Sequence, residues 1–187
     1  LGSQGYALGE KAIRDFDFKA GDKAIVFVLT GDYSRAIRED MTRIAFEDHG
    51  MEVVVIDAVT LGVADPNTLI PTISAALAAH PDTKIIVHPG GQQLGNAEAY
   101  AKAAGYGPNE IYQIGFDTSA QVMSGFVNGY VHLTADQQPF QEGYLPVFSL
   151  CQRLVLGLGP ISQDTGVGYV DVSNYGATID LANAGLR

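Results

Sequence analysis

Short apolar runs rich in β-branched residues recur along the chain, and polar or turn-forming residues separate them. Six of these runs are typical of strands, namely 24–29 (AIVFVL), 52–57 (EVVVID), 84–88 (KIIVH), 111–117 (IYQIGFD), 130–134 (YVHLT) and 167–172 (VGYVDV). Most of them are apolar without alternating with polar residues, which indicates strands that are covered on both faces.

Between these runs, apolar residues recur at helical spacing. Faces of this kind lie within 37–45, 69–77 and 122–127. Strands that alternate with helices are joined by long crossovers, and such crossovers favour parallel pairing. The pattern therefore predicts an α/β fold, a doubly wound parallel sheet with helices on both faces.

Charge and composition narrow the possible partners. The 11 Lys and Arg residues against 21 Asp and Glu residues give a formal net charge of −10. Because this charge repels a phosphate backbone, nucleic acid is not an expected partner. No apolar run reaches the roughly 20 residues that a membrane span needs. The sequence starts with Leu1 and without a signal peptide, so we expect a chain trimmed at its N-terminus.

Ligands of an open parallel sheet bind beyond the carboxyl ends of its strands, so the loops there hold the candidate site. After the first strand, Arg35 and Arg38 fall in the first turn of the expected helix, where a cation opposes the helix dipole. A guanidinium in this place can fork onto two hydroxyls or a carboxylate. A surface arginine paired with a neighbouring acid is an equally open alternative.

The loop after the third strand, HPGGQQLGN (88–96), is rich in glycine. Gly90 and Gly91 let backbone N–H groups approach a ligand, and the side chain of Gln92 can donate or accept a hydrogen bond. The loop matches neither a dinucleotide fingerprint nor a phosphate-binding loop. His88 has no second ligand at metal spacing, so a hydrogen-bonded loop histidine is favoured over a metal ligand.

The loop after the fourth strand begins with Asp117. This aspartate can simply cap the following helix, which is the commoner role. Its carboxylate can also accept hydrogen bonds from two hydroxyls at once, and Phe116 beside it offers an apolar face. That combination suits a sugar.

No catalytic constellation is present in the sequence. The chain contains no GxSxG, HExxH or CxxC motif, and its single Cys151 has no partner for a disulfide or a zinc site. We therefore expect binding without chemistry, with no catalytic residue, no metal and no cofactor.

The order of four segments resembles a known family. GSQGYALGEKA (2–12), GDYSRAIRED (31–40), IGFDTSAQVMSGFVNGYVHLTADQQPFQEGY (114–144) and GYVDVSN (168–174) are similar to the type 1 periplasmic sugar-binding proteins, the solute receptors of bacterial ABC importers. The ligand cores of lac-repressor-like transcription factors share this scaffold. The most specific element is GFD followed by a helix, a short strand and QQ-P-x-x-x-G.

The resemblance implies two α/β lobes joined by three crossovers, with the ligand clamped between them. Residues 1–134 match the second lobe, 135–165 match the second crossing and a helix of the first lobe, and 166–187 match the third crossing and the return to the second lobe. The first lobe would precede Leu1, so the six strands are not expected to form one closed sheet. The helix at 139–157 would expose an apolar side, so we expect it to fold back, swap or dimerise, with Cys151 in the contact.

The resemblance also implies roles for individual polar residues. Asp117 matches the strand-end aspartate that holds sugar hydroxyls, and Gln138 matches a polar residue of the crossing with the same role. The S-x-x-x-R spacing from Ser34 favours Arg38 over Arg35 as the family's arginine. Asp136 and Gln137 are expected to serve the crossing itself.

Two parts of the implied site are less well defined. Relatives commonly carry Asn or Asp in the third loop, where this chain has Pro89-Gly90-Gly91, so the backbone at Gly90 or the side chain of Gln92 would substitute. Tyr33 and Phe116 would supply stacking faces, although Phe116 fits a core position equally well.

The expected function is therefore an extracytoplasmic receptor, periplasmic in bacteria, that binds a small sugar or polyol and delivers it to the membrane permease of an ABC importer. The ligand-sensing core of a transcription regulator or signalling receptor is the alternative. An α/β enzyme is the least favoured class, since no motif supports it. A signal peptide or a helix-turn-helix upstream would separate the first two.

Overall fold

A computed structural model of the chain describes residues 2–28, 33–57, 66–166 and 168–187. The strands are β1 (Lys23–Val28), β2 (Glu52–Asp57), β3 (Thr83–Val87), β4 (Tyr112–Phe116), β5 (Leu133–Asp136) and β6 (Gly168–Asp171). The α-helices are α1 (Gly2–Phe16), α2 (Tyr33–Asp48), α3 (Ile70–Ala79), α4 (Gly91–Leu94), α5 (Ala97–Ala103), α6 (Ala120–Val127), α7 (Pro139–Leu156) and α8 (Ile179–Asn183). Two 3-10 turns, η1 (Pro66–Leu69) and η2 (Tyr175–Ala177), precede α3 and α8.

The sheet confirms the predicted α/β fold. Its strand order is β2-β1-β3-β4-β5-β6, and the first five strands are parallel to their neighbours. In this doubly wound order the chain changes direction between β1 and β3, where ligands of such folds bind.

The six strands form one open sheet, in which β6 pairs antiparallel with β5 at one edge. One expectation about the strands was wrong. The strand expected at 130–134 begins only at Leu133, because the N–H groups of Tyr130 and Val131 both donate to Gly125 O at the end of α6 (2.8 and 3.1 Å). Those residues close a helix instead of joining the ladder.

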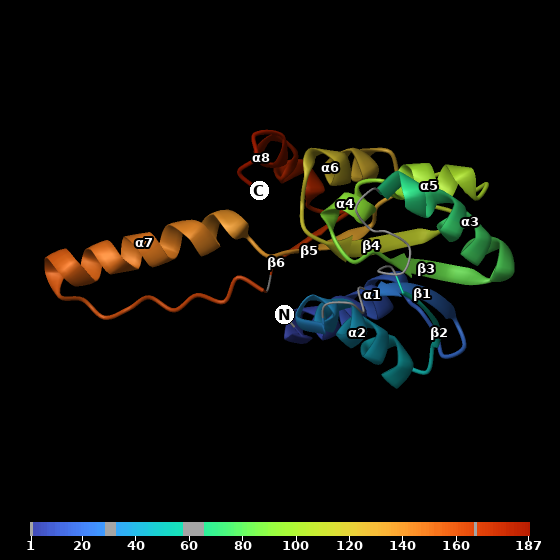
Figure 1. Cartoon of the computed structure of the whole chain (residues 1–187), viewed down its shortest axis with the longest axis horizontal. Helices are drawn as coiled ribbons and strands as arrows, with labels where there is room; N and C mark the ends of the chain where they lie inside the picture. Colours follow the sequence, from blue (N-terminus) through green and yellow to red (C-terminus); the bar gives the residue numbers. More distant parts are fainter. Residues whose placement is uncertain (1, 29–32, 58–65, 167) are drawn as a thin grey trace.

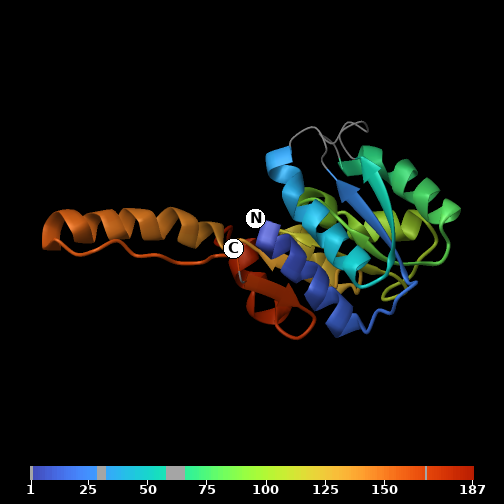
Figure 2. The ribbon, with the colours of Figure 1, turned by 90° about the horizontal axis from the view of Figure 1, so that it is seen from below.

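Helices cover both faces of the sheet, with α1 and α2 on one side and α3 to α6 on the other (Figures 1 and 2). Successive side chains of β1 alternate between the two layers. Ala24 and Val26 pack with α1 and α2, whereas Ile25 and Phe27 pack with α3 and α5, and all four are at most 1% exposed. This double burial explains why the strand sequences are apolar without alternation.

Glycines bring α1 unusually close to α2. A Cβ on Gly5 would lie 2.0 Å from the carbonyl oxygen of Arg38, and one on Gly9 would lie 2.6 Å from the Cβ of Ala45. Thr42 Oγ1 donates to Gly5 O at 2.8 Å across the same contact. The close approach sets the position of α2, and therefore of Arg38 on it.

The helix α7 projects from the sheet domain (Figures 1 and 2). None of its residues is buried, and Gly157, in the left-handed conformation (φ 68°), ends it. The segment after it returns alongside, where Ile161 N donates to Ser149 Oγ at 3.0 Å. The helix does not fold back onto the sheet domain, so that alternative was wrong.

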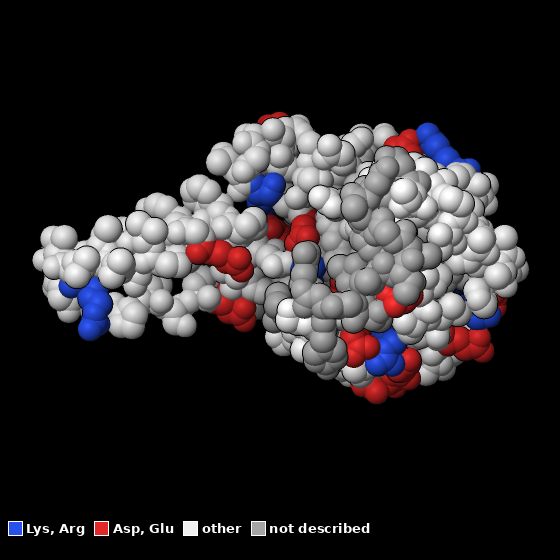
Figure 3. All heavy atoms as spheres, in the orientation of Figure 1, with Lys and Arg blue, Asp and Glu red and all other residues white. Residues whose placement is uncertain are grey.

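One side of α7 is apolar and exposed. The rings of Phe140, Tyr144 and Phe148 stack along it at centroid distances of 5.9 and 5.8 Å. Figure 3 shows few charged side chains here, and residues 139–166 include only Glu142, Arg153 and Asp164 as charged residues. No helix among the described residues is long and apolar enough to cross a membrane.

The last helix returns to the sheet domain. The ring of Tyr175 stacks on that of Phe126 at 5.4 Å, and Ala182 packs into a cluster with Val122 and Val170. These contacts hold α8 against α6. The division of the chain into lobes and crossings stays a prediction.

Two buried histidines share Gln113 as their hydrogen-bond partner. His88 Nε2 lies 3.0 Å from Gln113 Oε1, and Gln113 N lies 3.1 Å from His132 Nδ1. Burial lowers the pKa of His88 and of His132 to about 4. Protonation would place a hydrogen on His132 Nδ1, which already accepts one, so the folded state favours both neutral rings.

We predict that acid weakens the fold through these histidines. The unfolded state binds their protons below about pH 6.5 and the folded state only near pH 4, so the free energy of unfolding falls between these values, by up to about 3 kcal/mol per histidine. Urea unfolding at pH 7.5, 6, 5 and 4.5 measures the loss. In His88→Phe the loss should shrink, whereas in the control His80→Gln, at a partly exposed position, it should persist. Equal losses in both variants would contradict the prediction.

We also predict that α7 contributes little to stability. Leu154 and Val155 are 76% and 79% exposed, so Leu154→Ser should change the free energy of unfolding by less than about 0.5 kcal/mol. Leu8→Ala, at a position 0% exposed between α1 and the sheet, should cost about 2–5 kcal/mol. Comparable losses in the two variants would show that α7 is packed.

Candidate functional site

Polar groups from four segments meet at the carboxyl ends of the parallel strands. We call this group the Asp117 cluster and define it as Arg38 on α2, the Pro89 carbonyl after β3, the Gly91 N–H at the start of α4, Asp117 after β4, and Gln137 after β5. The cluster lies at the edge of the sheet where the loops were expected to hold the site.

Asp117, at the centre of the cluster, has an unusual backbone conformation. Its φ is +70°, its N–H donates to Ala135 O at 2.9 Å, and its carbonyl accepts from Thr134 Oγ1 at 2.7 Å. Both bonds tie it to β5, which fixes the direction of its side chain. The helix that follows is capped by Ser119, whose Oγ accepts from Val122 N at 3.1 Å. The alternative that Asp117 merely caps α6 was therefore wrong.

The carboxylate of Asp117 is held from several sides and is still partly open. Oδ1 accepts from Gln137 Nε2 at 2.8 Å and lies 3.6 Å from Arg38 Nη1, while Oδ2 accepts from Gly91 N at 3.3 Å. Its side chain is 41% exposed. A fixed and accessible carboxylate can accept hydrogen bonds from ligand hydroxyls.

Arg38 is buried beside the Asp117 carboxylate and pairs with it. Its side chain is 6% exposed, its Nη2 donates to Pro89 O at 3.0 Å, and its guanidinium carbon lies 4.5 Å from the centroid of the Phe116 ring. Arg38 sits in the second turn of α2 rather than the first, and it turns toward the sheet rather than pairing at the surface. The side chain of Arg35 lies outside the described residues.

The two predicted stacking residues are placed differently. The Phe116 ring is 0% exposed within the core, and Arg38 lies over one face of it, so the core position is the one observed. In this arrangement its ring offers no face to a ligand. Tyr33 begins α2, but its side chain lies outside the described residues and its role stays a prediction.

The third loop approaches Asp117 through its glycines. A Cβ on Gly91 would lie 3.1 Å from Asp117 Cβ, and one on Gly90 would lie 3.6 Å from Asp117 Oδ2. The backbone N–H that contacts the carboxylate is that of Gly91, not of Gly90. Gln92 is exposed on α4, with its carbonyl accepting from Asn96 Nδ2 at 2.9 Å, and no contact joins its side chain to the cluster.

The segment after β5 brings Gln137 rather than Gln138 to Asp117. Gln138 has a left-handed backbone (φ 57°), and its side chain donates to Thr165 O at 3.1 Å and accepts from Gln141 at 2.6 Å. The side chain of Gln137 donates to Asp117 instead. No local pattern indicates this difference, because it depends on the register that sets Phe116 beside Ala135.

A buried ion pair stabilises this turn. Asp136 is 0% exposed, its Oδ1 accepts from Gln138 N at 2.8 Å, and its Oδ2 lies 2.6 Å from Arg187 Nε. Arg187 therefore compensates the buried charge, while the other oxygen supports the left-handed backbone of Gln138. The expected role of Asp136 in the crossing stays a prediction, and no local pattern in the sequence marks Arg187 as its partner.

Chemically, the cluster combines a partly exposed acceptor with fixed donors and a buried cation. Among residues 2–28, 33–57, 66–166 and 168–187, no three His, Cys, Asp or Glu side chains are grouped to hold a metal ion. The arrangement can hold the hydroxyl groups of a polar ligand.

We predict that Arg187→Ala lowers the free energy of unfolding by about 1–3 kcal/mol, because it leaves the Asp136 carboxylate buried without its cation. Asp136→Asn keeps an acceptor for Gln138 N and removes the charge, so Arg187→Ala should cost much less in that background. A double-mutant cycle measured by urea unfolding gives the coupling. Additive losses would contradict the proposed charge compensation.

Known sugar-binding proteins are similar to this chain in sequence and in fold. No family model matches the chain. The xylose/arabinose-binding protein XylF of Sulfolobus acidocaldarius is 29% identical over 165 residues, which cover 83% of this chain and 39% of that protein.

Solved structures show the same fold. A carbohydrate transporter from Acidothermus cellulolyticus, solved in complex with myo-inositol, superposes with a TM-score of 0.73 at 23% identity and covers 100% of this chain and 62% of its own. An ABC sugar transporter (periplasmic sugar-binding protein) from Legionella pneumophila has a TM-score of 0.66 at 26% identity, covering 88% and 59%.

The chain therefore spans less than two thirds of the length of each of these proteins. They are sugar-binding or carbohydrate-transport proteins by name, and their names describe no enzyme. The predicted resemblance to the type 1 periplasmic sugar-binding proteins of ABC transporters is confirmed, and the similarity covers only part of the length of these proteins.

Proposed function

We propose that the chain is the sugar-binding part of an extracytoplasmic receptor for an ABC importer, and that the Asp117 cluster holds hydroxyl groups of a small sugar or polyol. The observation that carries the proposal is the Asp117 carboxylate, which is 41% exposed and held by Gly91, Gln137 and Arg38. A carboxylate that is already oriented loses little entropy when it accepts from a ligand.

The donors around this carboxylate also suit a sugar. A sugar hydroxyl both donates and accepts, so one hydroxyl can donate to Asp117 while a neighbouring hydroxyl accepts from the N–H groups of Arg38. Gln138 lies on the same crossing, and its expected contact with the ligand remains part of the proposal. The names of the relatives, with xylose, arabinose and myo-inositol among them, support this class of ligand.

Transport requires a second partner. A solute receptor delivers its ligand to a membrane permease, and we propose this partner and a periplasmic or otherwise extracytoplasmic location from the same relatives. Dimerisation or swapping through 139–157 stays a separate prediction, which light scattering tests: a monodisperse monomer would exclude both.

We predict that Asp117→Ala weakens sugar binding by at least about 100-fold, because it removes the acceptor and leaves Arg38 buried without its carboxylate. A thermal-shift screen with D-xylose, L-arabinose and myo-inositol identifies a ligand, since a ligand at 100 times its Kd stabilises by about 2.7 kcal/mol. Isothermal titration then measures the affinity of each variant.

Asp180→Ala is the matched control, because Asp180 is an exposed aspartate on α8, far along the chain from the cluster. It should bind as the unchanged chain does. Unchanged affinity in Asp117→Ala, with an intact fold by circular dichroism, would contradict the proposal that the Asp117 cluster binds the sugar.

A further inference from the structure

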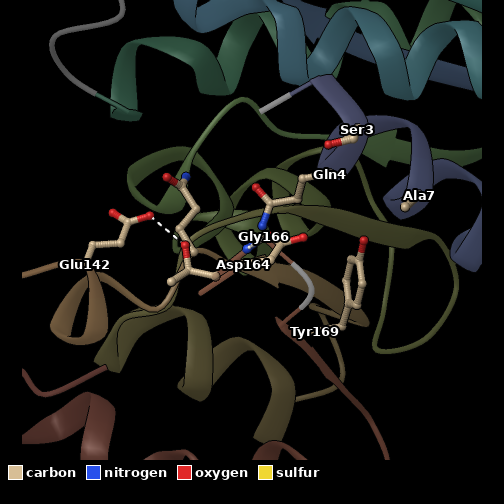
Figure 4. A pocket seen from close by; sticks show the side chains of 9 residues that line it. Ser3, Gln4, Ala7, Glu142, Asp164, Gly166 and Tyr169 are labelled. Carbon is tan, nitrogen blue, oxygen red and sulfur yellow. Dashed lines mark hydrogen bonds between the residues drawn. The ribbon is translucent and has the colours of Figure 1, made fainter. Parts of the chain in front are cut away.

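A second polar hollow lies beside the Asp117 cluster. It has a volume of about 430 Å³ and is lined by the first turns of α1, Gln137 after β5, the start of α7, residues 164–166 and Tyr169 (Figure 4). We call it the Gln4 pocket. Its volume falls within the range of about 300–1,000 Å³ that small-molecule sites occupy.

The wall formed by α1 contains an unsatisfied donor. Gln4 is 4% exposed, and its Nε2 has no hydrogen-bond acceptor among the described residues. Its side chain points into the pocket (Figure 4), close to the segment at Gly166, where a Cβ would lie 3.9 Å from Gln4 Cβ. A buried amide N–H without an acceptor is unfavourable, so this position is suited to a ligand oxygen.

Other residues that line the pocket present acceptors. Thr165 Oγ1 donates to Glu142 Oε1 at 2.9 Å, and Gly166 N donates to Asp164 Oδ1 at 2.9 Å. These bonds orient both carboxylates, and each carboxylate has about four acceptor positions in all. Tyr169 completes the lining with a phenol, whose pKa is raised, mainly by burial, so that it keeps its O–H proton.

This combination favours a ligand with hydroxyl groups. A hydroxyl can donate to Glu142 or Asp164 and accept from Gln4, whereas an ammonium group can only donate. The described residues that line the pocket include no Lys or Arg, which disfavours an anion.

We propose that the Gln4 pocket is a second binding site for the hydroxyl groups of a small sugar or polyol, and that it shares Gln137 with the Asp117 cluster. The class of ligand rests on the proposed function. Apart from Gln137, no residue that lines the pocket belongs to the Asp117 cluster. The hydroxyls belong either to the far end of the molecule held at Asp117 or to a second molecule.

Side-chain amide signals in nitrogen-15 NMR spectra test the site directly. The Gln4 signal is assigned by its loss in Gln4→Leu, and titration of the labelled chain with myo-inositol or D-xylose should shift it together with Gly166. In Gln4→Leu, the Kd measured from the Gly166 signal should rise by about two- to tenfold, the range for the loss of one hydrogen bond. Because Gln4→Leu removes a buried unpaired amide, the variant should fold, and its melting temperature should not fall below that of the unchanged chain. Tyr169→Phe is a second variant, and Gln121→Leu, at an exposed glutamine on α6, is the control.

The outcomes separate the two proposals. A common Kd for the Gln4 and Gly91 signals supports one bridging molecule, and two constants support two molecules; both support the site. If only Gly91 and Gln137 shift, the pocket proposal is overturned while the proposed function stands. If ethanolamine shifts the Gln4 signal and polyols do not, the pocket is a cation site and the proposed polyol site is overturned. If no signal moves at high sugar concentration, both proposals fail for this chain.

Discussion

The burial of the Arg38 guanidinium is the constraint on which the site depends. A cation that is 6% exposed must be compensated, and the carbonyl of Pro89, the carboxylate of Asp117 and the ring of Phe116 together do so. These partners follow two different strands, so the single side chain joins α2 to the ends of β3 and β4. The close approach of α1 to α2 at Gly5, against the carbonyl of Arg38 itself, fixes where that side chain starts.

The same arrangement explains the conformation of Asp117. Its left-handed backbone and its two main-chain contacts to β5 turn the carboxylate toward Arg38, while Gly91 allows α4 to begin against it. The segment after β5 contributes Gln137, and the ion pair of Asp136 with Arg187 holds that segment in place. The site is thus built from backbone geometry at three strand ends, with charge compensation beneath it.

The projecting helix α7 exposes apolar side chains to solvent. The stacked rings of Phe140, Tyr144 and Phe148 lie along it, and Leu154 and Val155 are exposed, whereas helices cover both faces of the sheet. The described contacts give α7 no packing partner beyond the segment that returns along it.

Local pattern determined the fold class, since unbroken β-branched runs and helical spacing depend only on neighbouring residues. It also marked Arg38 and Asp117, because a cation near a helix start and an acid at a strand end are visible in the sequence, and the order of motifs indicated the resemblance to the type 1 periplasmic sugar-binding proteins. Tertiary structure decided the rest. The pairing of β6 with β5, the burial of Phe116 and the choice of Gln137 over Gln138 depend on strand register and on contacts between residues far apart in the sequence. A shift of one residue along the crossing would turn a different side chain toward Asp117, and no local pattern specifies that register.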